Sequence, residues 1–383
     1  MPGARRGDLP RLSVAPMMDR TDRVYRRMVR RITRRTLLYS EMVTTGALLY
    51  GDVERQLARA PEESPVALQL GGDDPTALAQ AARLAEAYGY DEVDLNVGCP
   101  SDRVQRGGFG ACLMAAPELV AEAVAAMRGA CSLPVTVKHR LGIDDRDRFE
   151  DMLRFVEVVA EAGADRFVVH ARKAWLHGLS PKENRTVPPL RHEEVYRLAA
   201  ERPDLVVETN GGVSGLGDAV EHAPFVDGVM IGRAAYEAPM RLVTADARFF
   251  GSCEPVPTLR EVIDGVYELV EDERARGTRM ATLVRALVGL ARGVPGARGW
   301  RRALTLGAPL PGAGPELIER ASTWLSGDVL DARAAVGPEP RWRTQAAAVA
   351  AGRTVTSAST DTPQSLAASP SLSANSMVPS DPT

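Results

Sequence analysis

Several features that would place this chain in a membrane, outside the cell or around a metal are missing from it. Its 383 residues contain no run of about 18 apolar residues, which excludes a membrane-spanning helix. The charged first six residues are not followed by an apolar segment, so no secretory signal is expected. The cysteines lie far apart and form no C-x-x-C pair; they are Cys99, Cys112, Cys131 and Cys253. We therefore expect free thiols in a cytoplasmic protein, with no structural zinc or other metal and no membrane contact.

Lysine is almost absent as well. Of the 47 basic residues, only Lys138, Lys173 and Lys182 are lysines. A chain that uses arginine almost everywhere can retain lysine where a compact ammonium is needed and a planar guanidinium would not fit. These three positions are therefore candidates for specific roles, with survival by chance as the alternative.

The formal net charge of -3 does not favour a nucleic-acid partner, but the arginines are unevenly spread. Residues 1–36 contain eleven arginines against three acids, and residues 274–302 contain eight arginines and no acid. Such local excesses favour basic faces that bind phosphates, although an ordinary solvated surface explains them equally well.

Apolar, β-branched segments alternate with amphipathic ones along the first 250 residues. We expect helices such as 75–88, 117–128 and 148–162 between strands at residues 12–15, 36–40, 66–70, 92–97, 135–138, 166–170, 205–209 and 228–231. Eight strands that alternate with helices form a parallel sheet, and eight strands close a barrel. We therefore predict an α/β protein with a (β/α)₈ TIM barrel over residues 1–250. An open doubly wound sheet is the alternative.

The pattern changes near residue 250. Thr258 and Glu261 have the spacing of a capping box, and apolar residues then follow at helical intervals until Gly277, which suits a C′ position. Residues 251–330 are therefore predicted to form a small helical domain. Residues 331–383 are predicted to be a disordered tail, because Ala, Ser, Thr and Pro dominate its sequence.

Nearly every expected strand ends in polar or glycine residues. The C-terminal rim of a barrel is where active sites are built from several strands at once. These strand-end residues are Pro16, Met17, Met18, Glu41, Gln69, Asn96, Cys99, Lys138, Arg140, His170, Arg172, Asn210, Gly211, Gly212, Gly232 and Arg233. Each of these residues alone could have an ordinary structural role, but their occurrence at nearly every strand end favours a functional site on the rim.

The last two strand ends indicate a phosphate. Residues 210–212 and 232–233 match the usual phosphate site of a barrel, where glycines let backbone N–H groups approach the anion and an arginine adds charge. A Gly-Gly pair alone is also typical of a tight turn, and a phosphate alone does not separate FMN from a sugar phosphate. Gln69 and Lys138 are residue types that bond a flavin ring edge and stabilise the reduced flavin. No G-x-G-x-x-G motif is present, so NADPH would dock transiently as a reductant.

Cys99 is the most informative thiol. A lone cysteine is usually a small buried hydrophobe, but this one lies between Gly98 and Pro100 in a rim loop with no evident packing need. We interpret the other three as structural. His170 ends an apolar strand, so it is either a core histidine or a flavin or substrate contact, and its rim position favours a contact.

At these residues the chain resembles the tRNA-dihydrouridine synthases and, within them, the A subfamily. The matching segments are residues 15–19 (APMMD), 41–46 (EMVTTG), 95–105 (LNVGCPSDRVQ), 109–114 (FGACLM), 169–175 (VHARKAW), 178–185 (GLSPKENR) and 295–302 (PGARGWRR). The segment around Cys99 and residues 182–185 are highly specific. Arg20 stands where an aromatic is expected, and residues 106–108 differ from the family's usual loop after the cysteine.

The resemblance implies FMN-dependent reduction of tRNA uridines in the D-loop, at positions 20 and 20a in the usual tRNA numbering, with NADPH as reductant. Hydride would pass from flavin N5 to uracil C6 of a flipped-out uridine, and Cys99 would donate the proton to C5. FMN would be held by Pro16, Met17, Met18, Gln69, Lys138, His170, Asn210, Gly211, Gly212, Gly232 and Arg233. Asn96, Lys138 and Arg140 would orient the base. Lys182, Arg185, Arg298 and Arg301 would bind tRNA through phosphates and shape.

Three alternatives remain. A flavin-barrel reductase of free pyrimidines would need neither a helical domain nor the arginine-rich residues 274–302. A non-catalytic RNA-binding protein on the same fold would carry no flavin. A sugar-phosphate isomerase barrel would need a carboxylate base, for which Glu41 is the only strand-end candidate. A monomer is expected, because nothing in the sequence demands more.

Overall fold

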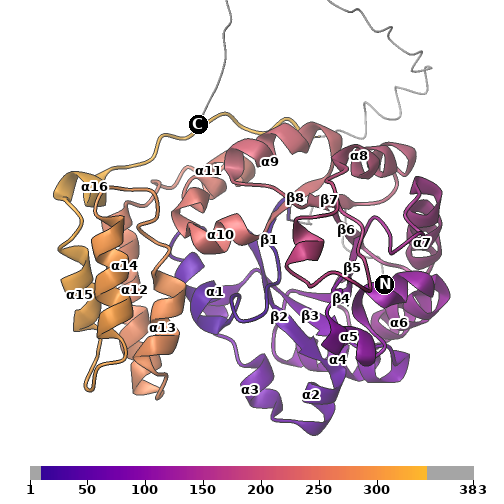
Figure 1. The fold of residues 1–383 in the computed structure, drawn as a ribbon, viewed down its shortest axis with the longest axis horizontal. Helices are drawn as coiled ribbons and strands as arrows, with labels where there is room; N and C mark the ends of the chain where they lie inside the picture. Colours follow the sequence, from indigo (N-terminus) through magenta and orange to yellow (C-terminus); the bar gives the residue numbers. More distant parts are fainter. Residues whose placement is uncertain (1–9, 343–383) are drawn as a thin grey trace, which may run out of the picture. The chain divides into compact units, whose positions relative to one another are not determined.

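The barrel is closed by eight parallel strands that pair in sequence order, and the first strand also pairs with the last (Figure 1). The computed structural model describes residues 10–342. The strands are β1 (Leu12–Val14), β2 (Leu37–Thr44), β3 (Val66–Gly71), β4 (Glu92–Val97), β5 (Val135–Arg140), β6 (Arg166–His170), β7 (Val207–Asn210) and β8 (Gly228–Ile231). The predicted TIM barrel is confirmed, and the open doubly wound sheet is excluded.

Helices connect the strands on the outside of the barrel (Figure 1). They are α1 (Arg23–Val29), α2 (Thr45–Tyr50), α3 (Val53–Leu57), α4 (Pro75–Ala87), α5 (Asp102–Arg106), α6 (Pro117–Ala130), α7 (Phe149–Glu161), α8 (His192–Glu201), α9 (Leu216–His222), α10 (Arg233–Glu237) and α11 (Ala245–Phe250). Short 3-10 helices are η2 (Pro61–Glu63), η3 (Gly110–Ala115), η4 (Glu183–Arg185), η5 (Ala223–Phe225) and η6 (Pro239–Leu242). Within residues 10–342, no helix is long and apolar enough to cross a membrane.

Local sequence explains where these helices begin. Helix α4 starts with Pro75 in its first turn, where a missing N–H costs nothing, and Asp74 caps it by accepting the Thr76 N–H at 2.8 Å. Its small apolar face, including Leu78 and Ala82, is fully buried against the barrel core. Burial of such faces supplies most of the stability of short helices.

The interior of the barrel holds a buried charge network as well as apolar side chains. Arg166 donates to both oxygens of Glu92 at 2.5 and 2.7 Å, and lies 3.5 Å from Glu208. Unpaired charges there would be very costly, so the pairing makes their burial possible. Together with the apolar cluster of Ala15, Tyr39, Val168 and Met230, this network forms part of the buried interior of the barrel.

The chain ends in a group of helices: α12 (Leu259–Ala275), α13 (Met280–Leu287), α14 (Ala297–Gly307), α15 (Glu316–Ser322) and α16 (Gly327–Asp331). Thr258 and Glu261 form the predicted capping box of α12, and Gly277 has the positive φ of 88° expected after its end. Trp300 is fully buried and donates to the Leu287 carbonyl at 3.2 Å, which ties α14 to α13.

These C-terminal helices contact the barrel through α1, which lies beside α12 and α13. Arg27 on α1 donates to Asp272 and Glu273 of α12 at 2.7 and 2.6 Å, and to Glu62 at 2.7 Å. The boundary of the helical domain at residue 251 stays a prediction. Most of the predicted tail, residues 343–383, lies outside the described residues. In the described part of the tail, residues 331–342, Arg333 forms an ion pair with Glu261 at 2.7 Å.

Candidate functional site

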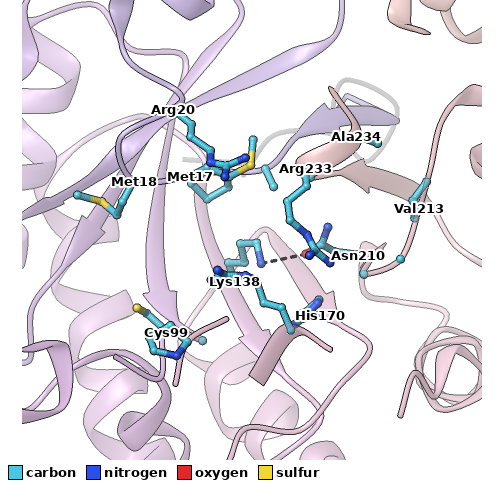
Figure 2. Close-up of a pocket in the computed structure, with 18 of the residues that line it drawn as sticks. Met17, Met18, Arg20, Cys99, Lys138, His170, Asn210, Val213, Arg233 and Ala234 are labelled. Atoms are coloured by element: carbon cyan, nitrogen blue, oxygen red, sulfur yellow. Dashed lines mark hydrogen bonds between the residues drawn. The ribbon is translucent and has the colours of Figure 1, made fainter. Parts of the chain in front are cut away.

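A cavity of about 690 Å³ opens at the carboxyl ends of the strands, and most of the residues predicted for the site line it. They are Pro16, Met17, Met18, Gln69, Asn96, Cys99, Lys138, Arg140, His170, Arg185, Asn210, Gly211, Gly212, Gly232 and Arg233. Figure 2 shows the Cys99 side chain on one side of the view, Asn210 and Arg233 on the other, and Lys138 between them. Of the strand-end residues, Glu41 and Arg172 do not line this cavity, and the others share this one space.

Three of the residues predicted to bind tRNA also do not line this cavity. Lys182 is exposed in the loop after β6, and Arg298 and Arg301 are exposed on α14. None of their side chains has a hydrogen bond or ion pair within residues 10–342, so all three are available to a partner.

Asn96 fixes the loop that carries Cys99. Its side-chain oxygen accepts the backbone N–H groups of Gly98 and Cys99 at 3.1 and 2.9 Å. Arg140 holds the loop from below by donating to the Gly98 carbonyl at 2.8 Å. The Cys99 thiol is half-buried and points toward the Ser101 hydroxyl at 3.5 Å. The loop thus has a defined shape that presents a thiol to the cavity.

Gln69 and Asp94 extend this arrangement into the barrel. Gln69 accepts from the Asn96 amide at 2.8 Å and donates to Asp94 at 2.7 Å. Burial raises the pKa of Asp94 to about 7, and repulsion from Glu92 adds to the effect. Burial also lowers the pKa of the Lys138 ammonium to about 8, while Asp94 opposes the shift. An acid and a base that titrate near neutral pH therefore lie together under the rim.

Gly211 and Gly212, which follow β7, form a backbone segment that has no room for larger side chains and is called the cradle below. Gly211 and Gly212 have φ values of 114° and 72°, which favour glycine. A Cβ on Gly211 would lie 2.8 Å from the His170 ring, and one on Gly212 would lie 2.6 Å from Leu190. Arg233 follows β8, which pairs with β7, and its guanidinium has no partner among the described residues. Open backbone beside a free guanidinium fits a phosphate.

His192 supports this cradle from beneath. Its Nε2 lies 2.9 Å from the Gly211 carbonyl, and its Nδ1 lies 2.9 Å from the Thr209 hydroxyl. Because a carbonyl can only accept, Nε2 carries the proton and Nδ1 accepts from Thr209. Burial lowers the pKa of His192 to about 4, and His222 adds repulsion, so the ring is neutral at physiological pH.

His170 is also neutral, because burial lowers its pKa well below the ordinary value and Arg140 and Lys138 repel its charged form. It lies at the end of β6 and lines the cavity. The neutral His170 ring can therefore contact a ligand in the cavity as a hydrogen-bond donor or acceptor.

The loop after β6 is organised by Asn184, which the sequence did not single out. This fully buried side chain accepts the Trp175 N–H at 2.8 Å and donates to the Trp175 and Leu179 carbonyls at 2.9 and 3.1 Å. Arg185 follows it and lines the cavity. Lys173 lies in the same loop and pairs with Asp147 at 3.3 Å, so its role in this structure is to brace the loop.

Three arginines of the N-terminal excess, Arg26, Arg27 and Arg30, are buried and do not contribute to a basic face. Arg26 and Arg27 are buried, and they pair with Glu63 at 2.7 Å and with Glu62 at 2.7 Å. Arg30 is buried too and donates to four backbone carbonyls, those of Thr33, Thr36, Glu63 and Pro65. These arginines hold the fold together, because acids and carbonyls distant in sequence converge on them.

Asp94, His192 and Asn184 are the site-supporting residues that sequence reasoning missed. Asp94 lies inside β4, His192 begins α8 and Asn184 lies in the short 3-10 helix η4. Only Asn184 carried a signal, since it belongs to the highly specific residues 182–185.

A closed parallel barrel with polar and cationic residues gathered at its C-terminal rim is the architecture of the (β/α)₈-barrel enzymes. The dihydrouridine synthase family model matches residues 13–321. A tRNA-dihydrouridine(20/20a) synthase from Synechocystis is 55% identical over 310 residues, which cover 81% of this chain and 93% of that protein. Enzymes of the same name from Vibrio vulnificus and Escherichia coli K12 are each 51% identical over 312 residues. Those alignments cover 81% of this chain and 95% and 90% of the two relatives. The chain belongs to the dihydrouridine synthase family.

Proposed function

We propose that this chain reduces the C5–C6 bond of D-loop uridines in tRNA, at positions 20 and 20a, with FMN as bound flavin and NADPH as reductant. The dihydrouridine synthase family is flavin-dependent, and the similar relatives are named for positions 20 and 20a. The observation that carries the proposal is that the Cys99 thiol and the cradle of Gly211, Gly212 and Arg233 open into one cavity.

The residues present fit FMN. Its phosphate would lie in the cradle, between the backbone of residues 211–212 and the free guanidinium of Arg233. The cavity continues from there past Lys138 to Gln69, so a ring system can occupy the space that a sugar phosphate would leave unfilled. Lys138 would place its ammonium beside the ring, and Pro16, Met17, Met18 and His170 would complete the walls.

The protein's own groups then account for the second half of the reaction. FMN, when bound, supplies a hydride to uracil C6. The Cys99 thiol donates its proton to C5 and remains as a thiolate, which takes a new proton from solvent before the next turnover. Asn96 holds the Cys99 loop by accepting the Cys99 N–H, and Arg140 holds the same loop by donating to the Gly98 carbonyl.

The tRNA would be held outside the cavity by Lys182, Arg298 and Arg301, and at its mouth by Arg185. In this proposal residues 251–330 act as the tRNA-binding domain, the enzyme works as a monomer, and the cytoplasm is its compartment. An accessible arginine-rich surface suits RNA phosphates, whereas a free base needs none.

The test is mass spectrometry of nucleosides from unmodified tRNA transcripts incubated with the purified protein and NADPH. A gain of two hydrogens on uridine, mapped to positions 20 and 20a, is the expected result. A yellow protein that oxidises NADPH but leaves the uridines of both transcript and native tRNA unchanged would contradict the proposal. Reduction of free uracil or uridine would then point to the free-pyrimidine alternative.

A further inference from the structure

The cavity carries more positive charge than one phosphate requires. Its lining includes a single carboxylate, Glu237, which pairs with Arg292 at 3.1 Å. The cationic side chains around it are Arg20, Lys138, Arg140, Arg185, Arg233, Arg241 and Arg292. A flavin phosphate and ring would use Arg233 and Lys138, and a uracil base is neutral, so the proposed cofactor and base leave several cations without a ligand.

Most of these remaining cationic side chains already form hydrogen bonds or ion pairs within the protein. Arg140 donates to three backbone carbonyls, and Arg241 donates to the Ser214 carbonyl at 2.7 Å. Among the described lining residues, only Arg20, Arg185 and Arg233 have guanidinium groups with no hydrogen bond or ion pair. Burial and repulsion by Arg233 and Arg20 lower the pKa of Arg185, so these charges act on one another across the cavity.

Arg20 is presented by a rigid turn directly after β1. The Met17 carbonyl accepts the backbone N–H groups of Arg20 and Thr21 at 3.1 and 3.0 Å. The buried Thr21 hydroxyl in turn accepts the Met17 N–H at 3.0 Å. Asp19, at the tip of the turn, has a positive φ of 60°. A turn that is hydrogen-bonded at both ends fixes the backbone of the half-buried Arg20 at the rim.

The guanidinium of Arg20 is supported by an aromatic ring instead of a carboxylate. It lies 4.9 Å from the ring centroid of Tyr236, and that ring packs 5.2 Å from the ring of Tyr25, which is fully buried. Stacking steadies the plane of a guanidinium and leaves its N–H edge available for a bidentate contact with a phosphate. Figure 2 shows Arg20 beside Met17, on the side of the cavity away from Cys99 and His170.

The surroundings of Arg20 favour a polymer over a small dinucleotide. The Tyr236 hydroxyl donates to the Arg285 carbonyl of α13 at 3.2 Å, and Arg292 also lines the cavity. Residues 274–302, to which both arginines belong, contain no acid. Through Tyr236, Arg20 therefore lies near Arg285 of this stretch, and Asp22 and Glu41 are close to the same ring. An RNA strand carries the consecutive phosphates that several such cations can bind.

We propose that Arg20 binds a backbone phosphodiester of the tRNA next to the flipped-out uridine, as a second anion subsite of the cavity separate from the cradle at Gly211 and Gly212. The inference rests on the proposed function. It makes Arg20 a positioning residue for the RNA, because its guanidinium contacts the backbone and not the reacting atoms.

The test is tRNA binding, which requires no turnover. Anisotropy of a fluorescent tRNA transcript is measured on the flavin-loaded wild type, on Arg20→Gln and on Arg20→Lys. Arg83→Gln is the matched control, because Arg83 is an exposed arginine of α4 without an ion pair in the described structure. We expect Arg20→Gln to weaken binding roughly tenfold and to lower the log–log salt slope by about one. Arg20→Lys should recover part of the affinity, and Arg83→Gln should change neither quantity.

Three results would overturn the assignment. Unchanged tRNA affinity and salt slope in Arg20→Gln would remove the phosphate contact. A raised KM for NADPH in flavin reduction, with tRNA affinity intact, would assign Arg20 to the reductant. Loss of flavin from the variant would place Arg20 in the cofactor site. If the wild type binds tRNA but reduces no uridine, the proposed function fails on its own, and the binding comparison still decides the role of Arg20.

Discussion

The side-chain oxygen of Asn96 accepts the backbone N–H of Cys99 at 2.9 Å, while the amide nitrogen of the same side chain donates to Gln69 at 2.8 Å. One side chain thereby links the loop that carries the thiol to a strand-end residue of β3. Because the N–H of Cys99 can only donate, the orientation of the Asn96 amide is determined by the loop.

Replacement of Asn96 by Ala should therefore slow tRNA reduction much more than flavin reduction. The loop would lose the acceptor for two N–H groups, and a displacement of about 1 Å of a reacting group can cost roughly 100-fold in rate. Stopped-flow measurement of the two half-reactions separates the effects. Equal slowing of both would mean that Asn96 acts on the flavin and not on the loop.

His192 provides a prediction about cofactor affinity. His192→Phe keeps an aromatic ring but leaves the Gly211 carbonyl without its donor, and an unsatisfied buried group costs about 1–3 kcal/mol. We expect the Kd for FMN, measured by fluorescence titration of flavin-free protein, to rise about tenfold. His192→Gln is the control, because its amide can replace the Nε2–H donor and should retain most of the affinity. Equal FMN affinities of the two variants would show that the donor to the Gly211 carbonyl does not contribute to cofactor binding.

Asp94 makes stability depend on pH in a defined direction. Its pKa is about 7 in the folded protein against an ordinary value of 3.8, so between these values the folded state retains a proton that the unfolded state has lost. Its contribution to stability is complete below pH 3.8 and is lost as the pH rises through 7, at up to about 1.4 kcal/mol per pH unit.

Asp94→Asn keeps an acceptor for Gln69 but removes this titration. Urea unfolding of flavin-free protein at several pH values should show that the variant gains stability relative to wild type as the pH rises from 4 to 7. A constant difference between the two proteins across that range would contradict the raised pKa.

The exposed arginines of α14 should affect tRNA binding in a salt-dependent way. Arg298→Ala combined with Arg301→Ala removes two cations that have no partner within the described residues, and each lost phosphate contact lowers the salt slope by about one. Arg320→Ala, at an exposed position on α15, is the control and should leave the slope unchanged. An unaltered slope in the double variant would mean that the helical domain does not contact RNA.

The barrel and its rim could be predicted because the relevant signals are local. Each strand is a short apolar segment, and the residues at or just after its carboxyl end, such as Lys138 or Gly211, must meet at one edge once the strands are parallel. The capping box at Thr258 is local as well. These features need no knowledge of which distant segments touch.

The supporting contacts could not be predicted, since they join residues far apart in the sequence. The pKa of Asp94 is raised because the side chain is buried in the barrel. Arg27 forms ion pairs with acids of α12 that lie about 245 positions away in the sequence. Counting arginines in residues 1–36 therefore suggested a basic face, whereas several of them are buried in ion pairs. Charge in a sequence does not reveal its partners.

The most direct test of the central claim follows the flavin through both half-reactions in Cys99→Ala. The variant enzyme is reduced by NADPH under anaerobic conditions and then mixed with unmodified tRNA, and reoxidation is read from flavin absorbance. We predict flavin reduction within about twofold of wild type and reoxidation by tRNA slowed by at least roughly 100-fold, because the general acid is missing. Reoxidation by tRNA at a rate near that of wild type would contradict the account, since the proton at C5 would then come from another group.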